Sequence, residues 1–362
     1  MNFRLPARSF LSGTAAAMMV LAVSGVAAEV AAPLPDPDGK PADMSKPVQV
    51  YILLGQSNML GAGKVTGDKE GSLTYAVQQK NKYPYLVDDE GKWSVRKDVR
   101  YVRVMGSGTG AMRQFNNDWM AIQGGKIGPE HGIGHYVGHA IDAPVLILKS
   151  CIGNRSLGWD LLPPGSERYE VEETDKKTGE TKTFVYAGYK DSPDKWEKGT
   201  EPQAINWYAG MQYDGDISNA KQVLAELDKV YPGAKTYEVA GFFFWQGDKD
   251  RYNAAHARRY EQNLVHLIKL LRKDFDAPNA KFVCATLGQT VRGAEGNEGL
   301  ILDAQLAVAS GKYPEFKGNV ACVYTNPLSM GGSSNSHYGG NAETYMNVGE
   351  AMGKAMVEML EK

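Results

Sequence analysis

One serine stands where a buried strand is expected to end. The motif GQSNM, residues 55–59, directly follows the apolar run VQVYILL at 48–54. A serine on a tight turn between a strand and a helix is exposed, and its own backbone N–H can face a developing oxyanion. The sequence therefore indicates Ser57 as a nucleophile. The alternative is that Ser57 only caps the helix that follows.

Two further hydrogen-bond donors follow other apolar runs. Gly153 comes after the run VLILK at 145–149, and a glycine lets the backbone approach a ligand closely. Gln246 comes after the run VAGFFF at 239–244, and its side-chain amide is a third donor. A buried structural role is the alternative for each residue taken singly. Three donors at three strand ends favour an oxyanion hole formed by Ser57, Gly153 and Gln246.

A histidine near the C-terminus is the predicted base. His337 lies in the motif SHYGG, after the apolar run VACVY at 320–324. Serine is a poor nucleophile until a neighbouring imidazole accepts its proton. In an open parallel sheet, ligands bind outside the carboxyl ends of the strands, where both residues are expected. A loop histidine taken singly is more often structural.

The elements that must position these residues follow from the hydrophobic pattern. The five apolar runs lack strict alternation, which is typical of strands buried on both faces of a parallel sheet. Helical spacing recurs between and after them, at 218–230 with Ser218 as the predicted N-cap, at 260–271 and at 345–359. The pattern predicts a three-layer α/β/α sandwich with a mainly parallel five-stranded sheet. The runs lie at 48–54, 145–149, 239–244, 282–287 and 320–324.

A polar stretch at 166–198 does not fit this alternation. Two alternating segments, YEVEET and TKTFVY, flank Thr178-Gly179. They predict an inserted β-hairpin with a charged loop that projects from the sheet edge. Two roles remain open for it, a lid or substrate-binding wall and a solvated excursion.

The first 28 residues predict export. Arg4 and Arg8 precede an apolar run at about 15–26, and small residues end at Ala28. This arrangement is typical of a cleaved signal peptide, and the run is shorter than the roughly 20 apolar residues of a spanning helix. We expect a periplasmic or secreted protein with no integral membrane segment after cleavage. The predicted organisation is a signal peptide at 1–28, a linker at 29–46 and one α/β domain at 47–362 that carries the polar insertion at about 166–198.

Composition argues against several partners. The chain has 362 residues, 43% of them hydrophobic and 23% charged, with a formal net charge of -2. That balance suits a globular enzyme and leaves no electrostatic footprint for nucleic acid. The three cysteines, far apart and without a CxxC pair, predict free thiols: Cys151, Cys284 and Cys322.

Three histidines spaced four apart are the remaining candidates for a metal site. His131, His135 and His139 would share one face of a helix, and HxxxH can bind zinc. The glycines between them interrupt such a helix, and no third type of ligand is evident. We therefore predict no metal.

The four motifs together resemble a known family. GQSNMLG, the Gly-Asn pair at 153–154, WQGD and the late HYG closely resemble the SGNH hydrolases, and more narrowly the sialate O-acetylesterase and carbohydrate esterase family six branch. The resemblance runs from residue 48 to the end, without the 166–198 insertion. It implies an SGNH/flavodoxin-like fold and cofactor-free hydrolysis of acetyl esters on sugars. It also implies that residues beside the catalytic positions contact the carbohydrate substrate: Gln56, Asn58, Asn154 and Trp245.

The sequence departs from the family at two places. The family commonly has Asp three residues before the histidine, where this chain has Ser334, and it has Glu at the position of Asp248. A hydroxyl cannot stabilise an imidazolium as a carboxylate does. We therefore predict the triad Ser57–His337–Asp248, with Asp250 as the reserve acid.

Two other functions remain open at this point. A lipid or thioester hydrolase would use the same residues, although the charged insertion is unlike the apolar lid of a lipase. A carbohydrate-binding protein on a decayed esterase scaffold would explain the missing family Asp. The sequence makes no prediction of oligomeric state.

Overall fold

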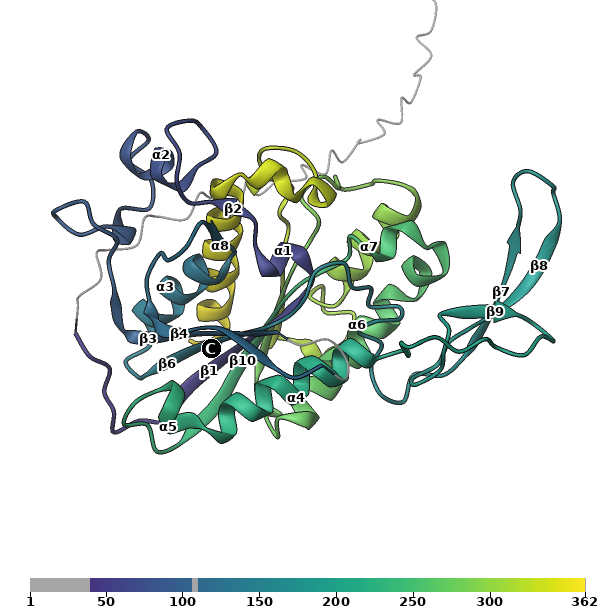
Figure 1. The fold of residues 1–362 in the computed structure, drawn as a ribbon, viewed down its shortest axis with the longest axis horizontal. Helices are drawn as coiled ribbons and strands as arrows, with labels where there is room; N and C mark the ends of the chain where they lie inside the picture. Colours follow the sequence, from purple (N-terminus) through teal and green to yellow (C-terminus); the bar gives the residue numbers. More distant parts are fainter. Residues whose placement is uncertain (1–39, 106–109, 362) are drawn as a thin grey trace, which may run out of the picture. The chain divides into compact units, whose positions relative to one another are not determined.

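Seven strands form the central sheet of the computed structural model, which describes residues 40–105 and 110–361 (Figure 1). The predicted signal peptide and residues 29–39 of the predicted linker lie outside the described residues. Six strands run parallel, and the edge strand β4 runs antiparallel to β3. In spatial order the strands are β12 (Val320–Val323), β11 (Lys281–Ala285), β10 (Tyr237–Trp245), β1 (Val48–Gly55), β6 (Val145–Ser150), β3 (Arg96–Met105) and β4 (Arg113–Met120).

Helices cover both faces of this sheet. Val50 and Ile52 of β1 pack into one hydrophobic core, while Tyr51 and Leu53 pack into the core on the opposite face. This arrangement confirms the predicted α/β fold with helices flanking a mainly parallel sheet. The first core is covered by α4 (Met211–Ala225), α5 (Leu227–Val230), α6 (Ala254–Asp274) and α7 (Gly296–Ala307), and the second by α3 (Glu130–Ala140) and α8 (Ala342–Leu360).

Shorter elements connect these layers. A third core lies beneath α2 (Leu73–Gln78) and η1 (Pro84–Leu86), and it includes Met346 of α8. The others are α1 (Ser57–Leu60), the antiparallel pair β2 (Gly63–Lys64) and β5 (Lys126–Ile127), and the 3-10 helices η2 (Asp250–Tyr252), η3 (Pro314–Phe316), η4 (Asn326–Leu328) and η5 (Ser334–Gly340).

Three sequence predictions need correction. The sheet has seven strands rather than five. The hydrophobic pattern did not predict β3 and β4, because both strands carry many charged and polar side chains. The helix expected to begin at Ser218 begins at Met211, after Gly210 in the left-handed conformation (φ 90°). The glycines of α3 do not interrupt the helix. A Cβ on Gly132 would lie 2.5 Å from the backbone nitrogen of Glu350, so this glycine lets α3 approach α8 closely.

The predicted hairpin is present and belongs to a three-stranded antiparallel sheet. β7 (Tyr169–Thr174) pairs with β8 (Thr181–Tyr186), which pairs with β9 (Lys195–Glu197). In Figure 1 this inserted sheet lies beyond α6, away from the central sheet. Its base packs on the domain through a small apolar cluster: Leu162, Ala187, Ala209, Trp159 and Trp196.

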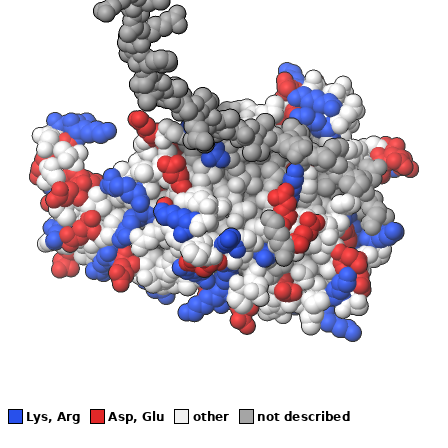
Figure 2. All heavy atoms as spheres, turned by 180° about the vertical axis from the view of Figure 1, so that it is seen from behind, with Lys and Arg blue, Asp and Glu red and all other residues white. Residues whose placement is uncertain are grey.

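The mixed surface charge and the free cysteines match what the composition predicted. Figure 2 shows Lys and Arg interspersed with Asp and Glu over the visible face. Within residues 40–105 and 110–361, no helix is long and apolar enough to cross a membrane. All three cysteines are free thiols, as predicted, and Cys151 and Cys284 are buried.

Candidate active site

The predicted motifs meet at the carboxyl ends of three neighbouring strands. β1 lies between β10 and β6, so the turns that follow these strands lie side by side. Gly55 ends β1 with φ 143°, and a Cβ there would lie 2.4 Å from the carbonyl oxygen of Trp245. Only glycine permits this approach of β1 to the end of β10. The chain then turns sharply, and α1 begins at Ser57.

Ser57 lies against the backbone of Gly153. Ser57 is half-buried, and a Cβ built on Gly153 would lie 3.5 Å from the Cβ of Ser57. Within the described part of the chain, neither residue's backbone N–H donates to a partner. Two backbone N–H groups close to the serine are thus without a protein acceptor. Backbone N–H groups of this kind can stabilise an oxyanion in acyl transfer when they point toward it.

Gln246 does not join these donors. Its Nε2 donates to the Arg155 carbonyl at 2.9 Å, to Asp250 Oδ2 at 2.6 Å and to Gln56 Oε1 at 3.1 Å. Its Oε1 accepts from the Tyr260 hydroxyl at 2.8 Å, and its side chain is fully buried. An amide nitrogen has only two hydrogens, so none remains for a substrate. In this arrangement Gln246 holds neighbouring turns together, and its predicted role as an oxyanion donor would require one of these hydrogen bonds to be exchanged for one to substrate.

Asp250 is the other half of the same network. Its Oδ2 accepts from the Leu157 N–H at 2.9 Å, and its Oδ1 accepts from the Gly158 N–H at 2.8 Å. The residue is fully buried, and burial raises the pKa of its carboxyl. Its oxygens face the turn after β6, and no hydrogen bond among the described residues joins it to His337, the residue that the reserve acid was predicted to support. Together, Gln246 and Asp250 hold the segment that follows Gly153.

His337 lies on a strained loop beside α1. It is half-buried in η5, which contacts α1, and it adopts the left-handed conformation with φ 51° and ψ 41°. Tyr345 donates its hydroxyl to the His337 carbonyl at 3.4 Å. Among the described residues, no hydrogen bond joins His337 to Ser57 or to Asp248. Catalytic hydrogen bonds commonly tighten only when substrate binds.

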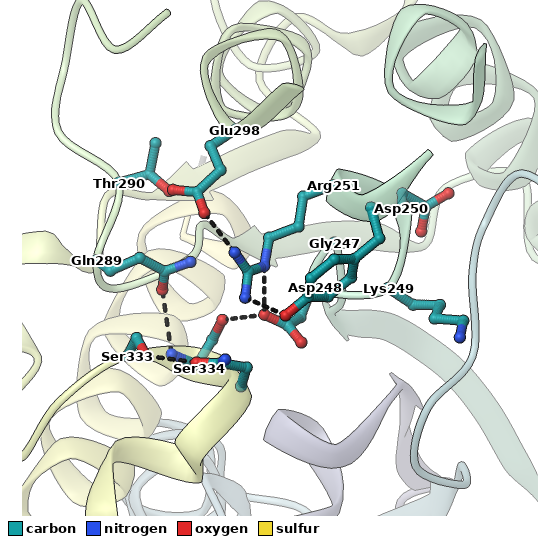
Figure 3. Close-up of polar contacts among 12 residues, drawn as sticks. Gly247, Asp248, Lys249, Asp250, Arg251, Gln289, Thr290, Glu298, Ser333 and Ser334 are labelled. Atoms are coloured by element: carbon teal, nitrogen blue, oxygen red, sulfur yellow. Dashed lines mark hydrogen bonds and ion pairs between the residues drawn. The ribbon is translucent and has the colours of Figure 1, made fainter. Parts of the chain in front are cut away.

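The carboxylate of Asp248, in the turn after β10, contacts Ser334, which occupies the position where the family commonly has Asp (Figure 3). Its Oδ1 accepts from the Ser334 hydroxyl at 2.5 Å and from Arg251 Nε at 2.9 Å. Ser334 is 1% exposed, and its backbone N–H donates to Gln289 Oε1 at 3.1 Å. Arg251 also pairs with Glu298, at 2.6 Å. The Asp248 carboxylate therefore lies beside Ser334, the residue three positions before His337 where the family commonly has Asp.

The residues predicted to contact substrate are mostly covered. Gln56 is 2% exposed, and its Oε1 accepts from the Lys249 N–H at 3.2 Å. Asn58 is fully buried with no partner for its amide among the described residues. Trp245 is also fully buried, stacks on Tyr338 with ring centroids 5.8 Å apart, and donates to the Thr286 carbonyl. Of the four residues predicted to contact substrate, only Asn154, beside Gly153, is exposed in this structure.

The histidines of α3 lie away from this site. His131 and His135 are buried, where burial lowers the pKa of both imidazoles, and His139 is exposed. The described residues contain no group of three or more His, Cys, Asp or Glu side chains arranged to hold a metal ion. The buried imidazoles instead pack against aromatic rings, those of Tyr101 and Tyr85.

One family model matches the chain. The family of carbohydrate esterases described as sialic acid-specific acetylesterases matches residues 191–358. That range includes Gln246, Asp248 and His337, whereas Ser57 and Gly153 precede it. A comparison with curated proteins found no match.

Three solved structures are similar to this chain. A protein from Arabidopsis thaliana has 17% identity and a TM-score of 0.47, over 86% of this chain and 98% of that one. A carbohydrate acetylesterase from Xanthomonas citri has 12% identity and a TM-score of 0.48, over 85% of this chain and 55% of that one. NanS has 14% identity and a TM-score of 0.40, over 77% of this chain and 78% of that one.

Proposed function

Since residues 191–358 belong to the sialic acid-specific acetylesterase family of carbohydrate esterases, we propose that this chain is an exported serine esterase that removes acetyl groups from carbohydrates. The observation that carries the proposal is that the backbone of Gly153 lies against the side chain of Ser57. It supplies free N–H donors beside a serine at the carboxyl end of a parallel sheet.

The proposed reaction has two halves. Ser57 Oγ attacks the acetyl carbonyl while His337 accepts its proton, and the N–H groups of Ser57 and Gly153 stabilise the oxyanion. The C–O bond to the sugar then breaks, and His337 protonates the leaving hydroxyl. Water attacks the acetyl-enzyme with His337 as base. Acetate leaves, and Ser57 regains its proton.

Asp248 is the proposed acidic partner. An imidazolium next to the nucleophile requires a negative charge to stabilise it. The hydrogen bond from Ser334 to Asp248 supports this role, because it holds a carboxylate beside the residue at the family's acid position. In this proposal Ser334 orients the carboxylate, and Asp248 supplies the charge that the hydroxyl lacks.

The proposal is tested with Ser57→Ala and a matched control. Purified mature protein is assayed with p-nitrophenyl acetate, then for acetate release from acetylated xylan, acetylated pectin and O-acetylated sialic acids. Ser57→Ala should lower turnover by several orders of magnitude, the scale of losing a triad member. Ser310→Ala, an exposed serine after α7, should behave as wild type.

Two results would redirect the assignment. Wild-type turnover in Ser57→Ala would exclude the mechanism. An inactive wild-type protein that still binds these sugars would favour the carbohydrate-binding alternative. Preference for long-chain acyl esters or thioesters would favour the other hydrolase class.

A further inference from the structure

A cavity of about 520 Å³ is lined by the segment that follows Gly153. Its volume is in the range of small-molecule sites. Asn154 and Arg155, the two residues after Gly153, line it, and so does Lys249, the residue after Asp248. Other lining residues come from the insertion and the loop after it, among them Asp194 and Trp207. The lining therefore begins one residue after Gly153, whose backbone lies against Ser57.

The insertion wall is fixed to the domain. His256 of α6 and Asp194 of the insertion are joined through Nε2 and Oδ1 at 3.0 Å. Burial lowers the pKa of His256, but the hydrogen bond and the charge of Asp194, together with the charges of Asp250 and Asp160, raise it overall. The Tyr186 hydroxyl donates to Glu173 within the insertion, and its ring meets that of His256 edge-on with ring centroids 5.6 Å apart. These contacts argue against a solvated excursion at this end of the insertion.

The lining combines aromatic rings with polar groups. Tyr252 is 64% exposed, and Trp207 is half-buried with the guanidinium of Arg155 4.6 Å from its ring centroid. Aromatic faces bind the apolar faces of sugar rings, and nearby polar groups bind the hydroxyls. The indole nitrogen of Trp207 is buried without an acceptor among the described residues.

The charges of the cavity are mostly compensated. Asp194 is paired with His256, and the carboxylate of Asp160 accepts from the N–H and the hydroxyl of Ser156. Lys249 is exposed, points away from the Asp248 cluster in Figure 3, and has no ion-pair or hydrogen-bond partner for its ammonium in the described part of the chain. A hydroxyl-rich ligand suits this balance better than a strongly charged one.

We propose that this cavity binds the sugar residue next to the acetylated one, so that the substrate is an acetylated oligosaccharide or polysaccharide. This inference rests on the proposed esterase function. It assigns the insertion and the loop at 205–207 to substrate recognition. A single acetylated monosaccharide would leave the cavity empty.

Kinetics with matched substrates test the proposal. The acetylated trisaccharide from xylan, a neutral and hydroxyl-rich chain, is compared with the acetylated monosaccharide of the same sugar. We expect at least about a tenfold higher kcat/KM for the trisaccharide, the scale of one good stacking contact. Trp207→Ala should lower this preference through KM. Tyr237→Ala, an exposed ring at the amino end of β10, should retain it.

Binding separates this proposal from the proposed function. Isothermal titration of the same trisaccharide into Ser57→Ala measures affinity without turnover. Trp207→Ala in that background should weaken binding about tenfold, and Tyr252→Ala provides a second variant on a more exposed ring. Equal kcat/KM for trisaccharide and monosaccharide, or unchanged binding in both ring variants, would overturn the cavity assignment. Loss of esterase activity with intact, Trp207-dependent binding would overturn only the reaction.

Discussion

Replacing Asp248 by asparagine tests how this chain supplies the acid that its sequence lacks before His337. The Asp248 side chain is 13% exposed, and its Oδ1 already accepts from Ser334 and Arg251. Asp248→Asn keeps the shape and an acceptor oxygen but removes the charge. We expect kcat to fall by about 10²–10⁴, the upper end being the loss when a triad Asp becomes Asn.

The double variant Asp248→Asn/Ser334→Asp provides the rescue. It returns a carboxylate to the family's position, beside an amide that can donate to it. We expect it to recover much of the lost kcat, whereas Ser334→Ala alone should cost little activity. Ser334→Asp alone should be less stable than wild type, because two carboxylates would lie in contact in a nearly buried place. Wild-type kcat in Asp248→Asn would refute the assignment of Asp248 as the acid.

Asp250→Asn is the matched control for this experiment. Its carboxylate accepts from the N–H groups of Leu157 and Gly158 and from Gln246. An amide offers one acceptor oxygen in place of two, so a buried N–H loses its partner at a cost of about 1–3 kcal/mol. Asp250→Asn should therefore lower the free energy of unfolding, whereas Asp248→Asn should lower kcat with a smaller change in stability. Thermal melts alongside the kinetics distinguish the two effects.

Two further predictions concern buried ionisable groups near α1 and α8. Lys149 pairs with Glu130 at 2.5 Å and donates to the Leu60 carbonyl, at the end of α1, at 3.1 Å. Because Lys149→Met leaves the buried Glu130 carboxylate without its partner, it should lower the free energy of unfolding by about 3–5 kcal/mol in urea titrations. The double variant Lys149→Met/Glu130→Leu should recover part of this loss. A loss below about 1 kcal/mol would contradict this reading of the pair. Burial raises the pKa of Glu350 from 4.5 to about 7. Between these pH values the folded state therefore binds more protons than the unfolded state. The free energy of unfolding should fall by about 3 kcal/mol as the pH rises from 4.5 to about 7. Glu350→Gln should remove this pH dependence from the melting temperature, and an unchanged profile would exclude Glu350 as its source.

The central parallel strands were predictable because each one is encoded by a continuous run of apolar residues. The runs at 48–54, 145–149 and 239–244 became β1, β6 and β10 within a few residues of their expected bounds. A strand buried on both faces needs apolar side chains throughout, and few other structures demand them. β3 and β4 lacked this signal. Arg96, Asp98 and Arg100 of β3 are buried with polar partners that only the folded chain provides.

The site was predictable in its positions and less so in its roles. The motifs indicated that Ser57, Gly153 and Gln246 follow neighbouring strands, and the strand order brings those turns together. Which group an amide or carboxylate faces depends on side-chain direction across contacts between distant segments. Gln246 and Gln56 are 190 residues apart, and no local pattern encodes their hydrogen bond. The cavity beside Trp207 was missed for the same reason, since its walls come from separate segments.

The turn after β10 combines a structural task with a chemical one. Gln246 and Asp250 face inward and fix the backbone after Gly153, on which the two free N–H donors depend. Asp248 stands between them in sequence but points to the opposite side, toward Ser334 (Figure 3). Gly247, with φ 135°, permits the change in chain direction that separates these side chains. Any substitution that shifts the backbone of this turn should therefore affect the proposed oxyanion donor Gly153 and the proposed acid Asp248 together. The chemical role of Asp248 can be measured cleanly only with changes that preserve its shape.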